Sequence, residues 1–234
     1  MWNIQRFEQI DSTNSALKRQ RDASHGTVYV AKRQSSGRGR MGRSFVSPHG
    51  IYYSVLLRRS EPPTSLMHLT AMVAVAVRRA LSKAADIQTD IKWVNDLLLG
   101  QKKLCGILVE SEGDRYIIGI GINCNTDPDD LPEDVRQMAA VISCDEELLI
   151  CELTRQLQDM DRCLLSHQKE WMQEYAAACV NIGKPVQILH GEERRQAVAV
   201  GVDENAALLV QESDGSIRSI SSGEVSVRGL YGYI

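Results

Sequence analysis

The sequence predicts an α+β fold in which strands and helices alternate first and short strands follow alone. Three observations lead to this prediction. Leucine and valine recur at helical spacing across residues 65–84, which is typical of an amphipathic helix. Short apolar runs bounded by turn residues lie on both sides of that segment and are typical of strands. Five more such runs crowd together after residue 183, which indicates a small barrel.

Length and composition set the outer limits. A chain of 234 residues can hold one large and one small domain, and we expect them over residues 1–181 and 182–234. A net charge of −3 excludes a globally basic nucleic-acid-binding protein. The six cysteines show no zinc spacing, and we expect free thiols packed in apolar surroundings. With neither a signal peptide nor a long apolar span, the chain is predicted to be cytoplasmic.

The elements of the larger part are predicted in chain order. Strands are expected at residues 4–7, 27–31, 51–57, 91–93, 96–99, 104–110 and 116–122. Helices are expected from Ser12 to about Arg21, over 65–84, and from 149 to 171 or beyond. Ser12 suits the first helix because its hydroxyl can accept an orphan backbone N–H.

The connections follow from turn residues. Tight turns at Gly100 and Gly113 predict antiparallel hairpins, and the acidic, proline-containing stretch 126–133 is expected to be a loop. Strands of the smaller part are expected at residues 186–189, 197–202, 208–211, 217–220 and 225–227.

Residues 37–43 alternate glycine with arginine and contain no acidic residue. Glycine lets a ligand approach the backbone closely, and each arginine offers a planar fork of donors suited to phosphate and carboxylate. No Asp or Glu occurs between Ala23 and Ser60, so the local field favours an anion. The segment predicts a loop that closes over an anionic ligand. A flexible surface loop with solvated charges is the alternative.

The same segment satisfies the dinucleotide-binding pattern G-x-G-x-x-G through Gly37, Gly39 and Gly42. That pattern needs a helix directly after it, so that the helix N-terminus receives the pyrophosphate. Here a turn-rich stretch leads into the strand expected at 51–57. The sequence therefore disfavours a dinucleotide site.

Two polar segments offer groups that both donate and accept hydrogen bonds. Ser12, Thr13 and Asn14 lie together at the start of the first helix, and their hydroxyl and amide groups suit a neutral polar ligand such as a urea. Gln34, just before the glycine–arginine loop, adds a second amide. The alternatives are a helix cap and a surface glutamine.

The segment 92–96 combines a cation with oxygen ligands. Lys92 at the end of a strand can neutralise phosphate charge, and Asn95 and Asp96 can hold Mg²⁺ through their oxygens. The alternative is a modest surface ion pair between Lys92 and Asp96.

Two later strands place glycine beside polar residues. Lys103 precedes Gly106 in one strand, and Gly119 and Gly121 precede Asn123 in another. Glycine inside a strand indicates close approach by a ligand or a neighbouring chain segment.

Taken together and in this order, these segments closely resemble biotin protein ligase, also called biotin–[acetyl-CoA-carboxylase] ligase, over nearly the whole chain. The resemblance implies a catalytic domain related to class II aminoacyl-tRNA synthetases, a mixed β-sheet flanked by helices, followed by an SH3-like barrel. It implies that biotin and ATP form biotinyl-5′-AMP and pyrophosphate. A lysine of the biotin carboxyl carrier protein of acetyl-CoA carboxylase then takes the biotinyl group.

Roles follow from the resemblance residue by residue. Val94 replaces a proline usual in the family, and Phe45 replaces a common tryptophan. The biotin head would be held by Ser12, Thr13, Asn14 and Gln34, and the loop that closes over the ligand would contain Gly37, Arg38, Gly39 and Arg40. The biotin–phosphate side would be lined by Lys103 and Gly106, and the adenine would face Asn123. The catalytic cations would be Lys92 and Arg40, and Mg²⁺ would be held by Asn95 and Asp96.

The physical logic agrees with those roles. Attack of a carboxylate on an α-phosphate brings two anions together, so cations and Mg²⁺ must offset the repulsion. The product is an acyl-phosphate anhydride, and an ordered loop would shield it from water.

Several alternatives stay open. A lipoate or octanoate protein ligase or transferase of the same superfamily is the nearer rival, and duplex DNA binding through the basic loop is the other. Some family members carry an N-terminal helix-turn-helix. Because the ligand motif begins at Ser12, we expect the form without DNA binding. A homodimer through the sheet edge is possible, and no membrane partner is expected.

Overall fold

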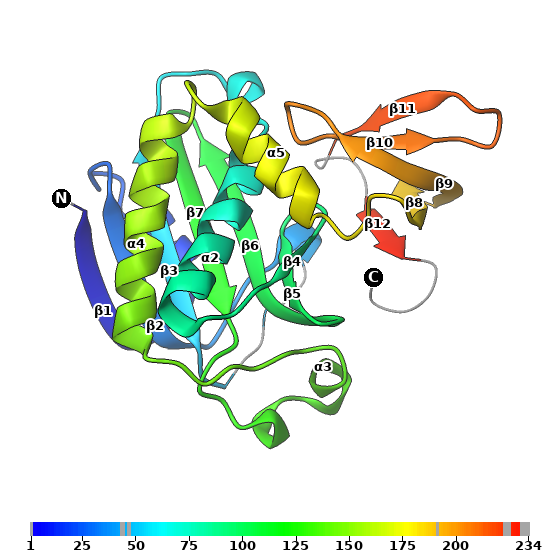
Figure 1. Ribbon diagram of the computed structural model, residues 1–234. Helices are drawn as coiled ribbons and strands as arrows, with labels where there is room; N and C mark the ends of the chain where they lie inside the picture. The colour runs from blue at the N-terminus through cyan, green and yellow to red at the C-terminus, as the bar shows by residue number, and fades with distance from the viewer. Residues whose placement is uncertain (1, 43–44, 46–47, 191, 222–225, 230–234) are drawn as a thin grey trace.

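The larger part of the chain is built on a seven-stranded sheet with the order β1-β2-β3-β7-β6-β5-β4. A computed structural model describes residues 2–42, 45, 48–190, 192–221 and 226–229 (Figure 1). The strands of this sheet are β1 (Asn3–Ile10), β2 (Thr27–Gln34), β3 (Ile51–Arg58), β4 (Asp90–Lys92), β5 (Asp96–Leu99), β6 (Lys102–Glu112) and β7 (Arg115–Ile122). β1 and β2 are parallel and the other neighbours are antiparallel, so the sheet is mixed.

The parallel pair determines where two functional segments begin. Its register runs from Asn3 opposite Thr27 to Ile10 opposite Gln34, and it continues as Ser36 donates its N–H to the carbonyl of Asp11 at 2.9 Å. Because parallel strands end at the same edge, the polar segment after β1 and the glycine–arginine loop after β2 start side by side.

Helices cover both faces of the sheet. α2 (Leu69–Ala85) and α4 (Glu146–Cys163) pack against each other over one face (Figure 1). α1 (Thr13–Arg19) packs against β2, β3 and β7, where Leu17 joins Leu56 in a second, smaller core. Because Leu56 lies between Val55 and Leu57 of the main core, strand alternation places the two cores on opposite faces. Burial on both faces explains why β3 is an almost unbroken apolar run.

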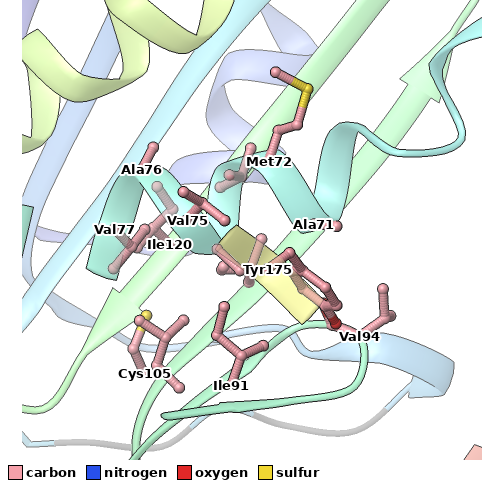
Figure 2. Close-up of a cluster of buried hydrophobic side chains, with 14 of the residues drawn as sticks. Ala71, Met72, Val75, Ala76, Val77, Ile91, Val94, Cys105, Ile120 and Tyr175 are labelled. Atoms are coloured by element: carbon pink, nitrogen blue, oxygen red, sulfur yellow. The ribbon is translucent and has the colours of Figure 1, made fainter. Parts of the chain in front are cut away.

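The main core extends to the end of the sheet that carries β4. Figure 2 shows Met72 and Val75 of α2 in one cluster with Ile91 and Tyr175. Each large apolar side chain buried there stabilises the fold by about 1.5–3 kcal/mol. Tyr175 comes from α5 (Gln168–Ala178), so this helix is anchored against the β4–β5 hairpin.

The prediction of one long helix from residue 149 to 171 or beyond is wrong. α4 ends at Cys163 and a turn separates it from α5, which begins at Gln168. The leucine spacing continues unchanged into Trp171, so periodicity could not reveal the break. The turn redirects the chain, and α5 crosses toward β4 (Figure 1).

The start of the second predicted helix also differs. Pro63–Leu66 forms a separate 3-10 turn, and α2 begins only at Leu69. Pro63 has no amide hydrogen and a fixed φ, so it starts a turn readily. The predicted loop at 126–133 likewise contains a 3-10 turn, Pro128–Asp130, and leads into a short helix, α3 (Glu133–Arg136). The hairpin turns are confirmed, with positive φ at Gly100 and Gly113 of 61° and 62°.

The C-terminal residues form a second, five-stranded antiparallel sheet with the order β11-β10-β9-β8-β12. Its strands are β8 (Pro185–His190), β9 (Glu193–Val202), β10 (Leu208–Gln211), β11 (Ile217–Ile220) and β12 (Ser226–Gly229). The small all-β part is confirmed. Val225 of the last predicted strand lies outside the described residues.

All six cysteines are free. Cys105, Cys124 and Cys179 are buried as expected, whereas Cys151 is exposed. Burial raises the pKa of the Cys105 thiol, so this thiol is a core residue and not a nucleophile. Within the described ranges, no helix combines the length and the apolar character needed to cross a membrane.

Candidate functional site

The segment after β1 turns two of its three polar side chains toward the sheet. Ser12, Thr13 and Asn14 are 3%, 3% and 4% exposed. Ser12 is the N-cap of α1, since its Oγ accepts the N–H of Ser15 at 3.4 Å. The capping interpretation therefore holds for Ser12, while Thr13 and Asn14 are free to form a network elsewhere.

The Asn14 side chain lies over three neighbouring strands, β3, β7 and β6, near the middle of each. Ser54 Oγ of β3 donates to Asn14 Oδ1 at 2.6 Å, and Asn14 Nδ2 donates to Glu110 Oε2 of β6 at 3.0 Å. Between them lies Gly119 of β7, paired with Ser54 on one side and Leu108 on the other. A Cβ on Gly119 would lie 2.3 Å from Asn14 Oδ1. Only glycine leaves room for this side chain.

Thr13 and Gln34 extend the network to the start of the loop. Gln34 Oε1 accepts both the backbone N–H of Thr13, at 2.6 Å, and its hydroxyl, at 3.0 Å. Ser54 Oγ lies 2.7 Å from Thr13 Oγ1, so the network is continuous with Asn14. Sequence reasoning missed Ser54, although a single serine among the apolar and aromatic residues of this strand was a signal.

The glycine–arginine loop joins β2 to β3, and these strands are antiparallel. In the described part of this segment a 3-10 turn and then β3 follow the glycines, where the dinucleotide fingerprint needs a helix. Arg38 Nη1 lies 3.5 Å from Glu110 Oε1, so one carboxylate of β6 contacts both the loop and Asn14. Arg40 opens a 3-10 turn, Arg40–Gly42. Arg43, the last residue of the predicted loop, lies outside the described part of the chain.

Phe45 lies on a platform made by two glycines. Gly106 of β6 and Gly121 of β7 are register partners, and a Cβ on them would come within 3.2 Å and 2.6 Å of the Phe45 ring. The Phe45 N–H donates to the carbonyl of Gly37 at 3.1 Å, while Lys103 Nζ lies 5.8 Å from the ring centroid. The Phe45 ring therefore contacts Gly106 and Gly121 and lies near Lys103.

Cations gather at the β4–β5 hairpin beyond that ring. Lys103 Nζ lies 2.7 Å from Asp96 Oδ1, and Arg40 Nη1 donates to Asn95 Oδ1 at 3.0 Å. Lys92 faces Asp96 across the hairpin as its register partner and is 9% exposed. The structure therefore brings Arg40, Lys92 and Lys103 to the same hairpin, whereas Arg38, the fourth cation that the sequence singled out, lies at Glu110.

The oxygens of Asn95 and Asp96 do not fit a ready-made magnesium site. The amide oxygen of Asn95 accepts from Arg40, and the carboxylate of Asp96 pairs with Lys103. Among the described residues, no group of three or more His, Cys, Asp or Glu side chains could hold a metal ion. The magnesium assignment to Asn95 and Asp96 stays a prediction that these contacts do not favour.

The Asn123 side chain is hydrogen-bonded to two backbone carbonyls. Its side-chain Nδ2 donates to the carbonyls of Lys103 and Ala140, both at 3.2 Å, and the residue is 4% exposed. These bonds tie the segment after β7 to β6. A role facing adenine stays a prediction.

Both departures from the expected family pattern keep their local environment. Val94 stands in a turn whose preceding peptide bond is cis, and its carbonyl accepts the Tyr175 hydroxyl at 3.2 Å. Phe45 packs edge-on against Tyr52, with ring centroids 6.0 Å apart. The aromatic position after the loop is therefore occupied and packed.

A series of contacts joins the neutral network to the cations. Gly37 lies next to Gln34, the carbonyl of Gly37 accepts the N–H of Phe45, and the Phe45 ring lies near Lys103. Neutral donors and acceptors at one end and cations at the other define a protein that binds a small molecule with an uncharged polar head and an anionic group.

Comparison with known proteins gives the same class. The Biotin/lipoate A/B protein ligase family matches residues 6–127, and the Biotin protein ligase C terminal domain matches residues 182–228. The bifunctional ligase/repressor BirA of Escherichia coli (strain K12) is 32% identical, over 94% of this chain and 72% of that protein. The biotin--[acetyl-CoA-carboxylase] ligase of Paracoccus denitrificans is 28% identical, over 88% and 92%.

The solved structures agree. The biotin protein ligase from Aquifex aeolicus in complex with biotin and ATP superposes with a TM-score of 0.87 at 30% identity, covering 98% of this chain and all of the other. The chain belongs to the biotin/lipoate A/B protein ligase family and, within it, to the biotin protein ligases.

Proposed function

We propose that this protein joins biotin to ATP as biotinyl-5′-AMP, with release of pyrophosphate, and then transfers the biotinyl group to a lysine of the biotin carboxyl carrier protein of acetyl-CoA carboxylase. One observation carries the proposal: contacts through Gly37 and Phe45 join a buried neutral network to a cluster of cations. Biotin has the matching polarity, with an uncharged ureido head and a carboxylate tail.

The head would be held by Thr13, Asn14 and Gln34, with Ser12 and Ser54 supporting them. A ureido group both donates and accepts, so hydroxyl and amide side chains can satisfy each of its polar atoms. The network is already hydrogen-bonded, so its groups are preorganised and binding would order few of them.

The tail would be activated at the cations. An oxygen of the biotin carboxylate attacks the α-phosphorus of ATP, and the bond from that phosphorus to the pyrophosphate oxygen breaks. Lys92, Lys103 and Arg40 would offset the repulsion between the two anions. No step is assigned to a metal held by Asn95 and Asp96, because their oxygens already contact cations.

The second step needs the loop. The neutral amine of the acceptor lysine attacks the acyl carbon, AMP leaves, and the amine loses a proton. Gly37, Arg38, Gly39 and Arg40 would close over the intermediate until that amine arrives, since water would otherwise hydrolyse the anhydride. Gly106 would leave room for the ligand beside Lys103, and Asn123 would face the adenine.

A single experiment separates this function from its nearest rival, a lipoate or octanoate ligase. The purified protein is incubated with ATP and Mg²⁺ and with biotin, lipoate or octanoate in separate reactions, and acyl-AMP and pyrophosphate are measured. We expect pyrophosphate to be released in the reaction with biotin and not in the reactions with lipoate or octanoate. Equal or greater release with lipoate would refute the assignment.

The acceptor is tested in the same preparation. A biotin carboxyl carrier domain is added, and its mass is followed for the increase of one biotinyl group. Its acceptor lysine changed to arginine is the control, because that variant keeps the charge but offers no comparable nucleophile. Failure to label the unchanged domain would refute the transfer step.

Four further properties belong to the same proposal. Residues 1–181 would form the ligase domain and 182–234 the small second domain, in a cytoplasmic protein that binds no DNA. A homodimer could form at β1, which ends the strand order of the large sheet. Sedimentation with and without biotin tests the dimer, and salt-dependent duplex binding would contradict the absence of a DNA role.

A further inference from the structure

The turn at residues 93–95, between β4 and β5, is held by the C-terminal part of the chain. The backbone N–H of Trp93 donates to Asn181 Oδ1 at 2.7 Å. Its indole Nε1–H donates to the carbonyl of Ala206 at 2.9 Å. Asn181 lies between α5 and β8, and Ala206 lies in the connection between β9 and β10. Two separate points of the later sequence therefore hold one residue of the hairpin.

Both bonds are buried. Asn181 is 1% exposed and Ala206 is 3% exposed, and Trp93 itself is 4% exposed. A buried N–H that loses its acceptor cannot turn to water instead, so each bond is costly to break. A third contact joins the turn to α5, where the Tyr175 hydroxyl donates to the carbonyl of Val94 at 3.2 Å.

The acceptor at Ala206 is set by an unusual backbone. Ala206 has φ of +64°, a left-handed conformation that residues with a Cβ rarely adopt. The side chain of Asp203 fixes it, because Asp203 Oδ1 accepts the N–H groups of Asn205 at 2.9 Å and Ala207 at 2.8 Å. The N–H of Ala206 also donates to the Asp203 carbonyl at 3.1 Å. The contacts of Asp203 therefore fix the backbone that presents the Ala206 carbonyl to Trp93.

The turn at residues 93–95 adjoins the cation cluster. Lys92 immediately precedes Trp93, and Asn95 accepts from Arg40 of the loop at 3.0 Å. The backbone of Asn95 is also paired with β6, through the N–H of Ile107 at 2.9 Å. A displacement of the turn would move Lys92 and the acceptor for Arg40 together.

We propose that Asn181 and the carbonyl of Ala206 are positioning groups for adenylation, acting through Trp93 to set the places of Lys92 and of the Asn95–Arg40 contact. This inference rests on the proposed function. The biotin-head network lies on α1, β2, β3 and β6, and among the described residues its hydrogen bonds run to partners other than Asn181 and Ala206. Their loss is therefore expected to lower kcat for adenylation and to leave the KM for biotin unchanged.

Three variants test the two bonds. Asn181→Leu removes the acceptor, Asn181→Asp keeps an oxygen in place, and Trp93→Phe removes only the indole N–H and part of the ring. We expect Asn181→Leu and Trp93→Phe each to lower kcat for biotin-dependent pyrophosphate release by about tenfold, the scale of one buried hydrogen bond. Asn181→Asp should keep kcat within about threefold of the wild type. Asn205→Ala is the matched control, because Asn205 lies next to Ala206 in the turn at residues 203–207 and is exposed. This variant should not change kcat.

A double-variant cycle distinguishes positioning from loss of stability. If Asn181 acts through Lys92, Asn181→Leu should lower kcat far less in a Lys92→Ala background than in the wild type. A general loss of stability would lower kcat by the same factor in both. The melting temperature is recorded for every variant. If Asn181→Leu fails to fold, Trp93→Phe is used in the same cycle.

Three results would overturn the inference: an unchanged kcat in both Asn181→Leu and Trp93→Phe, an equal loss of kcat in the two backgrounds, or a rise in the KM for biotin at constant kcat. These outcomes differ from a failure of the proposed function, which would appear as a wild-type protein that releases no pyrophosphate with biotin.

Discussion

Replacing Gly119 by alanine tests the geometry of the polar network most directly. Gly119 lies in the middle of β7, and an added Cβ would lie 2.3 Å from Asn14 Oδ1 and 2.8 Å from Asn14 Cγ. No relaxed contact is that short, so Asn14 must move. It cannot move far, because α1 and three strands surround it and it is only 4% exposed.

The cost follows from the bonds that Asn14 would lose. The bond from Ser54 joins neutral groups and is worth about 1 kcal/mol, and the bond to the Glu110 carboxylate is worth about 1.5–3 kcal/mol. Loss of both lowers the free energy of unfolding by about 2–4 kcal/mol. For a chain of this length, that corresponds to a fall in melting temperature of roughly 5–15 °C.

The functional effect should be specific for biotin. With its head site distorted, we expect the KM for biotin to rise by about tenfold or more, since each tenfold step is about 1.4 kcal/mol. The KM for ATP should change little. The assay is pyrophosphate release at varied biotin and saturating ATP, with the melting temperature measured alongside.

Two controls make the result interpretable. Gly113→Ala places a Cβ where nothing lies within 4 Å, at a φ of +62°, so it should cost about 1–2 kcal/mol of strain without changing the KM for biotin. Asn14→Ala combined with Gly119→Ala removes the same two bonds without the clash, so its melting temperature and its KM for biotin should both be close to those of Gly119→Ala alone. If Gly119→Ala alone lowered the melting temperature with an unchanged KM for biotin, the placement of the biotin head at Asn14 would be wrong.

Three other perturbations give separate tests. Lys92→Ala should slow adenylate formation more than about 100-fold, as expected for one lost electrostatic stabiliser; a loss below about tenfold in pyrophosphate release would exclude its leading role. Arg40→Gly removes the bond to Asn95 and should leave adenylate formation measurable while biotinyl-AMP escapes about tenfold faster or more, as followed by rapid gel filtration; unchanged retention would contradict the loop assignment. The Arg19 side chain lowers the pKa of Asp11 to about 2, so Asp11 stabilises the fold above its usual pKa and loses that contribution as pH falls from about 4 to about 2. Arg19→Ala should therefore lower the free energy of unfolding only slightly at pH 7, because the pair is exposed to solvent, and should leave it unchanged below pH 2; urea unfolding at both pH values measures the difference.

Local patterns in the sequence predict much of this fold. Glycine turns located the hairpins at Gly100 and Gly113, and Ser12 marked the start of α1, because a turn or a cap depends on residues only a few positions apart. The break between α4 and α5 was not predictable in this way, since the apolar spacing is the same on both sides of it.

The candidate site likewise contains residues that the sequence predicts and residues that it does not. Thr13, Asn14, Gln34 and Arg40 could be selected by residue type and order, because the chemistry of a polar head and an anion requires such groups. Ser54 and Glu110 could not, because they become partners of Asn14 only when strands from distant parts of the chain align. The hold of Asn181 on Trp93 is equally invisible, since it joins residues 88 positions apart.

The parallel pairing of β1 with β2 has a practical consequence for altering this chain. Both strands run into the ligand region at the same edge, so their far ends meet at the opposite side of the sheet, where Arg21 and Asp22 are exposed. A peptide tag inserted between those two residues would break the bond from the Ala23 N–H to the Gln20 carbonyl, but it would leave the register of β1 and β2 unchanged. One extra residue between Ile10 and Ser12 would instead shift every polar contact downstream, so the first position should accept an insertion and the second should not.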